Sequence, residues 1–203
     1  MKVALIGATG NIGTRLLAEL VSRGHTITAI ARHPEKVSAK PGVSAKRGDV
    51  SDKAGLAALL GGHDAVISAV RFGNTDARTL VDAVKASGVP RYLVVGGAGS
   101  LEVAPGQKLI DTPAFPAAYK PEASKGGMFL DLLRGEKDLD WTFLSPSALI
   151  QAGQRTGKFR LGGDQLLTDS KGASSISYED FAVALIDELE KPAHSRRRFT
   201  VGY

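Results

Sequence analysis

Short apolar runs alternate with amphipathic stretches along the first half of the chain. The runs are rich in Val, Ile and Thr and are bounded by Gly or Pro, which is typical of strands. They cover residues 3–6, 26–31, 43–47, 65–70 and 92–95. Between them, apolar residues recur every three or four positions, which predicts helices that end at Gly24, Gly61 and Gly88. This alternation predicts an α/β fold with a doubly wound parallel sheet, because right-handed crossovers place helices on both faces.

The second half is less regular and predicts a small lobe beside the sheet. Residues 101–121 contain four prolines and are expected to form a long loop. The helix that follows has a predicted apolar face of Ala123, Met128, Leu130, Leu132 and Leu133. Further expected elements are strands at residues 141–144 and 198–201, a helix at 181–189, and a hairpin or lid within 150–174. We therefore expect one domain over residues 1–203, with a small substrate lobe formed by residues 101–121 and 145–175.

Composition narrows the classes of protein. A chain of 203 residues is long enough for one domain with a substantial core. It has no cysteine, which excludes a disulfide scaffold, a thiolate metal site and a cysteine nucleophile. The four histidines are scattered without metal-ligand spacing, so no metal site is predicted. No apolar stretch reaches the roughly 18 residues of a membrane span, and the N-terminus lacks a signal-peptide pattern, so we expect a cytoplasmic protein.

The basic charge is concentrated near the N-terminus. The net charge of +5 equals the excess in the first fifty positions, which hold eight Lys and Arg against three Asp and Glu. A nucleic-acid binder usually carries such charge in a stripe with interleaved aromatic residues. Here the basic residues are scattered, apart from the run at residues 196–198, which we interpret as a solvated entry to the last strand. Neither nucleic acid nor a membrane is an expected partner.

A glycine-rich segment links the first predicted strand to the first predicted helix. It is Gly7-Ala8-Thr9-Gly10-Asn11-Ile12-Gly13. In a dinucleotide site the first glycine allows a tight turn, the second lets a pyrophosphate approach the backbone, and the third lets the helix pack closely on the sheet. Free N–H groups and the helix dipole then hold the phosphates, with Thr9 and Asn11 as further polar contacts. The segment predicts a nucleotide-binding, Rossmann-like domain; the alternative is a turn that only packs helix on strand.

The end of the second predicted strand indicates which dinucleotide binds. A site for NAD usually places Asp or Glu there for the ribose 2′-hydroxyl, whereas a site for NADP usually places Arg. This chain has Arg32 and no acidic residue at that point, and Glu35 lies too late in the turn. A guanidinium pairs well with a phosphate monoester, so we predict NADP (NADPH) in preference to NAD. Arg15 and Lys36 are additional candidates for the same phosphate.

Two further strand ends are expected to contribute to this site. Asp49 and Val50 follow the third strand, where a carboxylate can accept a hydrogen bond from the adenine amino group and a valine can pack on the ring. The alternative role of capping the next helix suits Ser51 or Asp52 better. The fourth strand ends beside the point where the strand order reverses, which is where open α/β sheets bind ligands. The residues there are Ala69, Val70 and Arg71.

Taken together, these features resemble the atypical short-chain dehydrogenase/reductase group. Within it, the chain looks most like the small NAD(P)H-binding proteins related to flavin reductase and biliverdin reductase B, and like the NmrA-like redox sensors. The resemblance covers nearly the whole chain and rests on residues 7–13, 32, 48–50, 64–68, 140–142, 144–146 and 176–180. It implies the fold and the cofactor more specifically than the substrate.

The catalytic pair of the wider superfamily is missing. In its Tyr-x-x-x-Lys pattern the lysine lowers the pKa of the tyrosine, which then acts as an acid or base. Here Lys125 is expected to begin the corresponding helix, but Pro121 stands in the tyrosine position. Tyr119 is either brought to the nicotinamide by a local loop or packed within that loop. Lys125 either contacts the nicotinamide ribose or lies on the helix surface, and Ser100 matches the catalytic serine position.

Hydride transfer to a flavin or quinone needs no acid from the protein, because solvent can supply the proton. We therefore predict an NADPH-dependent oxidoreductase that transfers hydride to a flavin, a quinone or a similar conjugated acceptor. Its candidate catalytic residues are Ser100, Tyr119 and Lys125. The alternatives are a non-catalytic NADP(H)-binding redox sensor and a nucleotide-sugar epimerase. The expected partner is a small-molecule substrate, and the expected oligomeric state is a monomer or homodimer.

Overall fold

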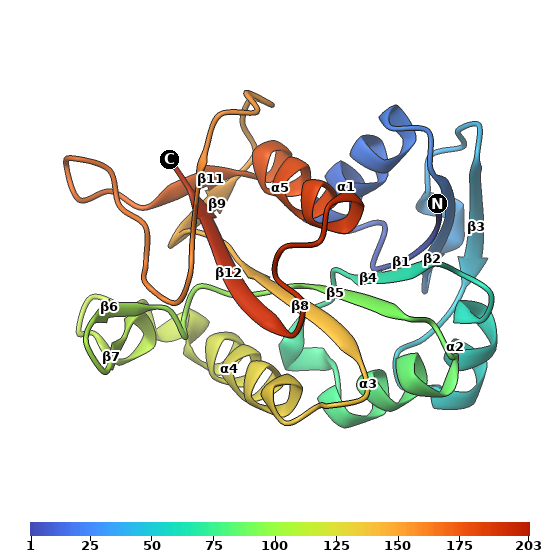
Figure 1. The fold of residues 1–203 in the computed structure, drawn as a ribbon, viewed down its shortest axis with the longest axis horizontal. Coiled ribbons are helices and arrows are strands. Elements are labelled where there is room, and N and C mark those ends of the chain that lie inside the picture. The colour runs from blue at the N-terminus through green and yellow to red at the C-terminus, as the bar shows by residue number, and fades with distance from the viewer.

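An eight-stranded sheet forms the middle layer of the computed structural model, which describes residues 1–203 (Figure 1). Its strands are β1 (Lys2–Ile6), β2 (Thr26–Ala31), β3 (Val43–Arg47), β4 (Ala65–Ser68), β5 (Arg91–Val95), β8 (Asp140–Ser145), β10 (Arg160–Gly162) and β12 (Arg197–Gly202). They follow the order β10-β12-β8-β5-β4-β1-β2-β3. All neighbours are parallel except β10, which pairs antiparallel with β12. The order reverses between β1 and β4, which confirms the doubly wound sheet.

Five helices cover the two faces of the sheet (Figure 1). They are α1 (Asn11–Ser22), α2 (Lys53–Leu60), α3 (Ala77–Ala86), α4 (Lys120–Arg134) and α5 (Tyr178–Glu190). Helices α1 and α5 lie on one face, and α2, α3 and α4 lie on the other. Each face has its own core, because β1 turns Val3 and Leu5 to one side and Ala4 and Ile6 to the other. The central strands β1, β4 and β5 are almost entirely buried and mostly apolar, which explains why short apolar runs located them, whereas the edge strand β3 is largely exposed.

Local chemistry sets several helix ends. Asp52 caps α2 by accepting a hydrogen bond from the backbone N of Gly55 (2.9 Å), so it, and not Asp49, is the capping residue. The helix α1 ends at Ser22, and Gly24 follows with a φ of 75°, a conformation that suits glycine at a helix end. No helix has the length and apolar character needed to cross a membrane.

Helix α4 begins earlier than expected. It starts at Lys120, so that Lys125 lies in the second turn. Pro121 lies in the first turn, where its missing N–H group costs no helical hydrogen bond and its ring fits the backbone. The proline therefore belongs to the start of the helix instead of standing outside it.

The buried face of α4 also differs from the expectation. Met128 was expected to be buried, but it is 67% exposed. The buried residues are Gly126, Phe129, Leu130 and Leu133. Within this face, Gly126 packs against the ring of Phe72. A Cβ at Gly126 would lie only 3.0 Å from that ring, so the close contact favours a glycine. Periodicity alone could not distinguish the two faces, since the contact to Phe72 comes from a loop fifty residues away.

The two predicted lobe segments pack against each other. Residues 101–121, expected to be a loop, contain the antiparallel hairpin of β6 (Glu102–Ala104) and β7 (Gln107–Lys108) (Figure 1). Backbone hydrogen bonds link Glu102 N to Asp164 O (2.9 Å) and Leu166 N to Glu102 O (2.8 Å). The hairpin expected within residues 150–174 does not form. Instead β9 (Leu149–Gln151) pairs with β11 (Ser175–Ser177), and β10 extends the main sheet along the edge of β12.

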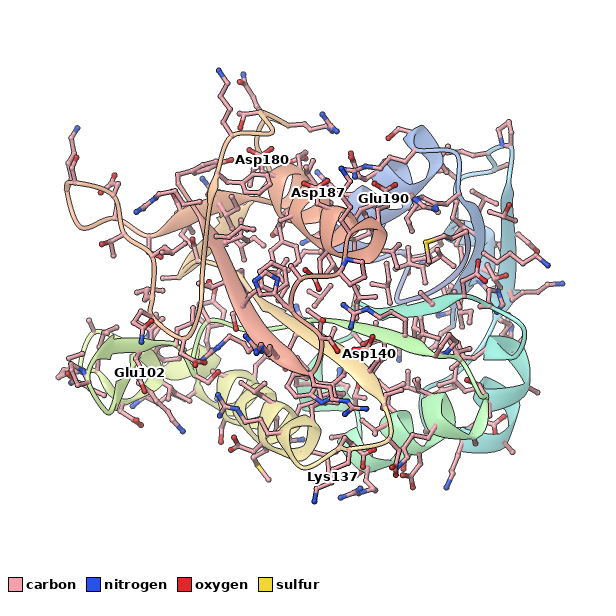
Figure 2. The ribbon with its side chains drawn as sticks, in the orientation of Figure 1. Glu102, Lys137, Asp140, Asp180, Asp187 and Glu190 are labelled. Atoms are coloured by element: carbon pink, nitrogen blue, oxygen red, sulfur yellow. The ribbon has the colours of Figure 1, made fainter.

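The second lobe segment is fastened to α1 and α5 by buried acidic residues. Asp180, at the start of α5 (Figure 2), accepts hydrogen bonds from the backbone N of Thr156 and of Gly157, both at 2.8 Å. On α1, both carboxylate oxygens of Glu19 accept from Arg155, again at 2.8 Å. The charge-assisted bonds to Arg155 hold the pKa of Glu19 below its usual range. The lobe is thus tied to the scaffold by side chains whose partners are distant in sequence.

The basic run at residues 196–198 is not a uniformly solvated strand entry. The side chain of Arg198 is only 3% exposed, and its Nε donates to Asp164 Oδ1 (2.6 Å). Burial lowers the pKa of the Arg198 guanidinium, and the Asp164 carboxylate partly offsets this effect. A charge placed this deeply needs such a partner. The interpretation of the run as solvated was therefore wrong for Arg198.

Candidate functional site

A groove of about 300 Å³ lies across the carboxyl ends of β1, β2, β3 and β4. Open α/β sheets bind ligands at this edge, where the strand order reverses. Most residues predicted to bind a cofactor line the groove. These are Gly7, Thr9, Gly10, Arg32, Asp49, Val50, Ala69, Val70 and Arg71. The remaining three, Asn11, Ile12 and Gly13, form the first turn of α1 directly after Gly10.

Two of the three motif glycines are required by the fold itself. Gly7 has a φ of 83°, and a Cβ there would overlap the carbonyl oxygen of Ala69 on the neighbouring strand end. A Cβ on Gly13 would overlap the carbonyl oxygen of Gly7 and lie 3.0 Å from its carbonyl carbon. The positive φ of Gly7 fits the tight turn predicted for the first glycine, and its contact holds this turn against the end of β4. The contact of Gly13 brings α1 close to the end of β1, as predicted for the third glycine.

Gly10 differs from the other two because the packing does not require it. Its φ of −77° suits any residue, and a Cβ would meet no atom closer than 3.5 Å. The residue is exposed and lines the groove. The position therefore fits a group that approaches the backbone from outside the protein, such as a pyrophosphate.

The start of α1 is suited to an anion. Gly10 is the N-cap residue and supplies no side-chain cap, and the first turn carries no acidic residue. The helix thus presents N–H groups without side-chain partners, together with the positive end of its dipole, toward the groove. Phosphate oxygens are the usual ligands of such a helix end when it follows a glycine-rich turn.

Charged residues at the other strand ends make the groove predominantly basic. Arg32 and Arg71 line it, are exposed and form no ion pair with the protein. Asp49 is the acidic residue of the lining; its Oδ1 accepts hydrogen bonds from the backbone N (2.9 Å) and hydroxyl (2.8 Å) of Ser51. These bonds, aided by the charge of Arg32, hold the pKa of Asp49 below its usual range. The carboxylate stays ionised, and its Oδ2 has no protein partner, which leaves it free to accept from an adenine amino group.

The two additional candidates for a phosphate ligand do not line this groove. Arg15 turns toward α5, where its Nε donates to Glu179 Oε1 (3.0 Å) and its guanidinium lies 5.5 Å from the ring centroid of Tyr178. Lys36 is exposed in the turn after β2. Among the basic residues considered for this role, Arg32 is thus the one that lies in the groove.

The three candidate catalytic residues are not joined in one hydrogen-bonded arrangement. Ser100 Oγ accepts from Arg198 Nη1 (3.4 Å). Tyr119 is 66% exposed at the start of α4, and its hydroxyl has no protein partner. Lys125 donates from Nζ to the carbonyl oxygen of Gly73 (2.8 Å) and not to a tyrosine. The tyrosine–lysine pair that was missing from the sequence is therefore not rebuilt by the fold.

Several residues of this region escaped the sequence analysis. Asn74 and Thr75 line the groove on the loop after β4, as Arg71 does. Glu122 accepts hydrogen bonds from backbone groups of the same loop. An acidic residue in the first turn of a helix is so common that it signals only the helix start. The contact of Glu122 with a loop fifty residues away becomes visible only in the fold.

Comparison with known proteins agrees with this geometry. The NAD(P)H-binding family model matches residues 7–192. The uncharacterized protein YwnB of Bacillus subtilis (strain 168) is 42% identical, over 99% of this chain and 98% of its own. The aligned region thus includes both the groove and the lobe.

Solved structures extend the likeness. A protein of Bacteroides thetaiotaomicron, named as a candidate epimerase, is 45% identical over 100% of this chain and 96% of its own, with a TM-score of 0.96. A Streptococcus pneumoniae protein named as a candidate NADH-flavin reductase is 38% identical over 100% and 99%, with a TM-score of 0.87. A short-chain dehydrogenase/reductase of Veillonella parvula, solved in complex with NADP, shares the fold at 19% identity over 100% and 94%, with a TM-score of 0.80. With its glycine-rich turn, its doubly wound sheet and the match over residues 7–192, the chain belongs to the NAD(P)H-binding family.

Proposed function

We propose that the protein is an NADPH-dependent reductase that transfers hydride to a flavin, a quinone or a similar conjugated acceptor. The observation that carries the proposal is the basic groove, in which Gly10 is open to an approaching phosphate and Arg32 has no partner in the protein. NADPH, when bound, supplies the hydride. The protein binds and orients it, which is the usual division of labour in enzymes of this kind.

Each part of the groove has a proposed role. The first turn of α1 holds the pyrophosphate, with Thr9 and Asn11 as neighbouring polar contacts. Arg32 binds the 2′-phosphate through paired hydrogen bonds. Asp49 accepts from the adenine amino group through its free Oδ2, and Val50 packs on the ring. The NADP in the Veillonella structure is consistent with this choice of cofactor.

The proposed acceptor class follows from the residues near α4. Reduction of an ordinary ketone needs an acid beside the carbonyl oxygen. Pro121 occupies the tyrosine position, Tyr119 is exposed, and Lys125 bonds a backbone carbonyl. A flavin or quinone accepts hydride into a conjugated ring and takes its proton from water, so it does not require that acid. The name of the Streptococcus protein points to the same class.

A non-catalytic sensor of NADP(H) is the second candidate function. The same lack of a proton-transfer chain favours it, because a sensor needs only the cofactor groove. The name of the Bacteroides protein suggests an epimerase as a further alternative. That reaction normally uses the tyrosine–lysine pair, and this chain does not assemble one.

Steady-state oxidation of NADPH, followed by its absorbance, tests the reductase. We expect turnover with FMN or with members of a quinone panel, and faster turnover with NADPH than with NADH. Anaerobic assays that also measure the reduced acceptor provide the control for oxidase side reactions. Tight NADPH binding without turnover on any acceptor would reject the reductase and leave the sensor.

A further inference from the structure

The loop after β4 forms one wall of the cofactor groove and rests on α4. Arg71, Asn74 and Thr75 of this loop line the groove. Within this loop, residues Phe72–Asn74 form a single 3₁₀ turn. Local hydrogen bonds shape the turn, since Thr75 Oγ1 donates to the carbonyl oxygen of Arg71 (2.8 Å), but they do not attach it to the rest of the protein. Its position against α4 therefore depends on tertiary contacts.

Polar side chains of α4 hold the backbone of this turn. The carboxylate of Glu122 accepts from Phe72 N through Oε1 and from Gly73 N through Oε2, both at 2.7 Å. Nζ of Lys125 donates to the carbonyl oxygen of Gly73 (2.8 Å). Glu122 and Lys125 are three residues apart and therefore project from the same side of the helix. Together the two side chains bind the N–H groups of Phe72 and Gly73 and the carbonyl group of Gly73.

Apolar packing also fixes this turn, on the side that faces the core. The side chain of Phe72 is buried, with its ring centroid 5.3 Å from that of Phe129 and 6.1 Å from that of Phe143. With Phe72 anchored in the core, its N–H group donates to Glu122 of α4. A buried N–H left without a partner is costly, so the carboxylate makes this loop position favourable.

We propose that Glu122 and Lys125 are positioning residues that hold the loop of residues 71–75 as the wall of the cofactor groove. Lys125 acts here through Gly73 and does not act on the nicotinamide ribose or on a catalytic tyrosine. This role rests on the proposed function, because the wall matters to activity only if the groove binds NADPH. Through these two residues α4 would support cofactor binding indirectly, although no residue of the helix lines the groove.

Two nearly isosteric variants test the role, with two matched controls. Glu122→Gln keeps one acceptor but removes the charge, and Lys125→Met keeps the aliphatic chain but removes the donor. Asp131→Asn on the exposed side of α4 and Lys137→Met beyond its end (Figure 2) remove the same charges away from the loop. NADPH affinity is measured by calorimetry, amide exchange at residues 72 and 73 by mass spectrometry or NMR, and folding by thermal unfolding.

We expect Glu122→Gln to weaken NADPH binding about fivefold and Lys125→Met about threefold, because each loses one charge-assisted bond that holds the wall. Exchange at residues 72 and 73 is expected to accelerate about tenfold in Glu122→Gln. The double variant should lose less than the product of the single losses, since both bonds hold one loop. Both controls should match the wild type.

The outcomes separate the roles. Unchanged NADPH affinity and unchanged amide exchange in both variants would reject the inference. So would a large fall in kcat for Lys125→Met at unchanged NADPH affinity, which would assign the lysine to the reacting end of the cofactor. Affinity and exchange are read without turnover, so an absence of turnover counts against the reductase proposal alone.

Discussion

Replacing Arg32 with alanine is expected to weaken NADPH binding by about 10- to 100-fold, because a guanidinium paired with a phosphate contributes about 1.5–3 kcal/mol. NADH binding should change by less than about threefold, since it lacks the 2′-phosphate. The structure supports this large difference, because Arg32 lies exposed in the groove and forms no ion pair within the protein, so its guanidinium is free to bind a phosphate.

Calorimetric titration of both dinucleotides at one fixed ionic strength measures this effect, because salt screens exposed charges. Arg78→Ala, at the start of α3 and outside the groove lining, removes the same charge and controls for long-range electrostatics. Equal losses for NADPH and NADH in Arg32→Ala would contradict the 2′-phosphate role. Such a result would instead assign Arg32 to binding the pyrophosphate, which both dinucleotides share.

Gly13→Ala is expected to lower the free energy of unfolding by about 3 kcal/mol, which lowers Tm by roughly 6–12 °C in a domain of this size. The added Cβ would overlap the carbonyl oxygen of Gly7, and neither α1 nor the end of β1 can move without disturbing the core. Chemical denaturation and calorimetric melting measure the loss.

Gly10→Ala is the matched variant in the same segment. Its backbone already suits alanine, and the nearest atom to the new Cβ lies 3.5 Å away, so we expect stability within about 0.5 kcal/mol of the wild type. Affinity for NADPH and NADH should fall together by about tenfold or more, because the methyl group occupies the approach of the shared pyrophosphate. Full affinity in Gly10→Ala would place the phosphates elsewhere.

The contrast between these glycines shows how far the sequence pattern reaches. The motif predicted the turn, the close helix packing and the phosphate approach, and the structure shows a packing need at Gly7 and Gly13. Only the geometry revealed that Gly10 has no such need. The sequence shows only the spacing of the three glycines. The neighbouring atoms determine whether a glycine is needed for packing or is open to a ligand.

Errors in the sequence analysis fall where long-range contacts override local pattern. Met128 follows the helical period of its apolar neighbours, yet α4 rotates so that Gly126 meets Phe72 and Met128 faces solvent. Arg198 belongs to a basic run that local reasoning places in water, yet Asp164 from the lobe supplies the partner that makes burial tolerable. Arg15 turns to Glu179 on α5 instead of the groove.

By itself, the sequence determined the order of the five helices and the seven parallel strands, the doubly wound sheet and the glycine-rich turn that places the protein in its family. These features follow from periodicity, turn residues and doubly covered strands, all of which act over a few neighbouring positions. The tertiary structure alone decided that Glu122 and Lys125 hold the groove wall, that Arg32 remains unpaired while Arg15 does not, and that Arg198 is buried. The physical reason is that hydrogen bonds, ion pairs and close packing join residues 34 to 164 positions apart, and no local pattern encodes which distant partner each side chain meets.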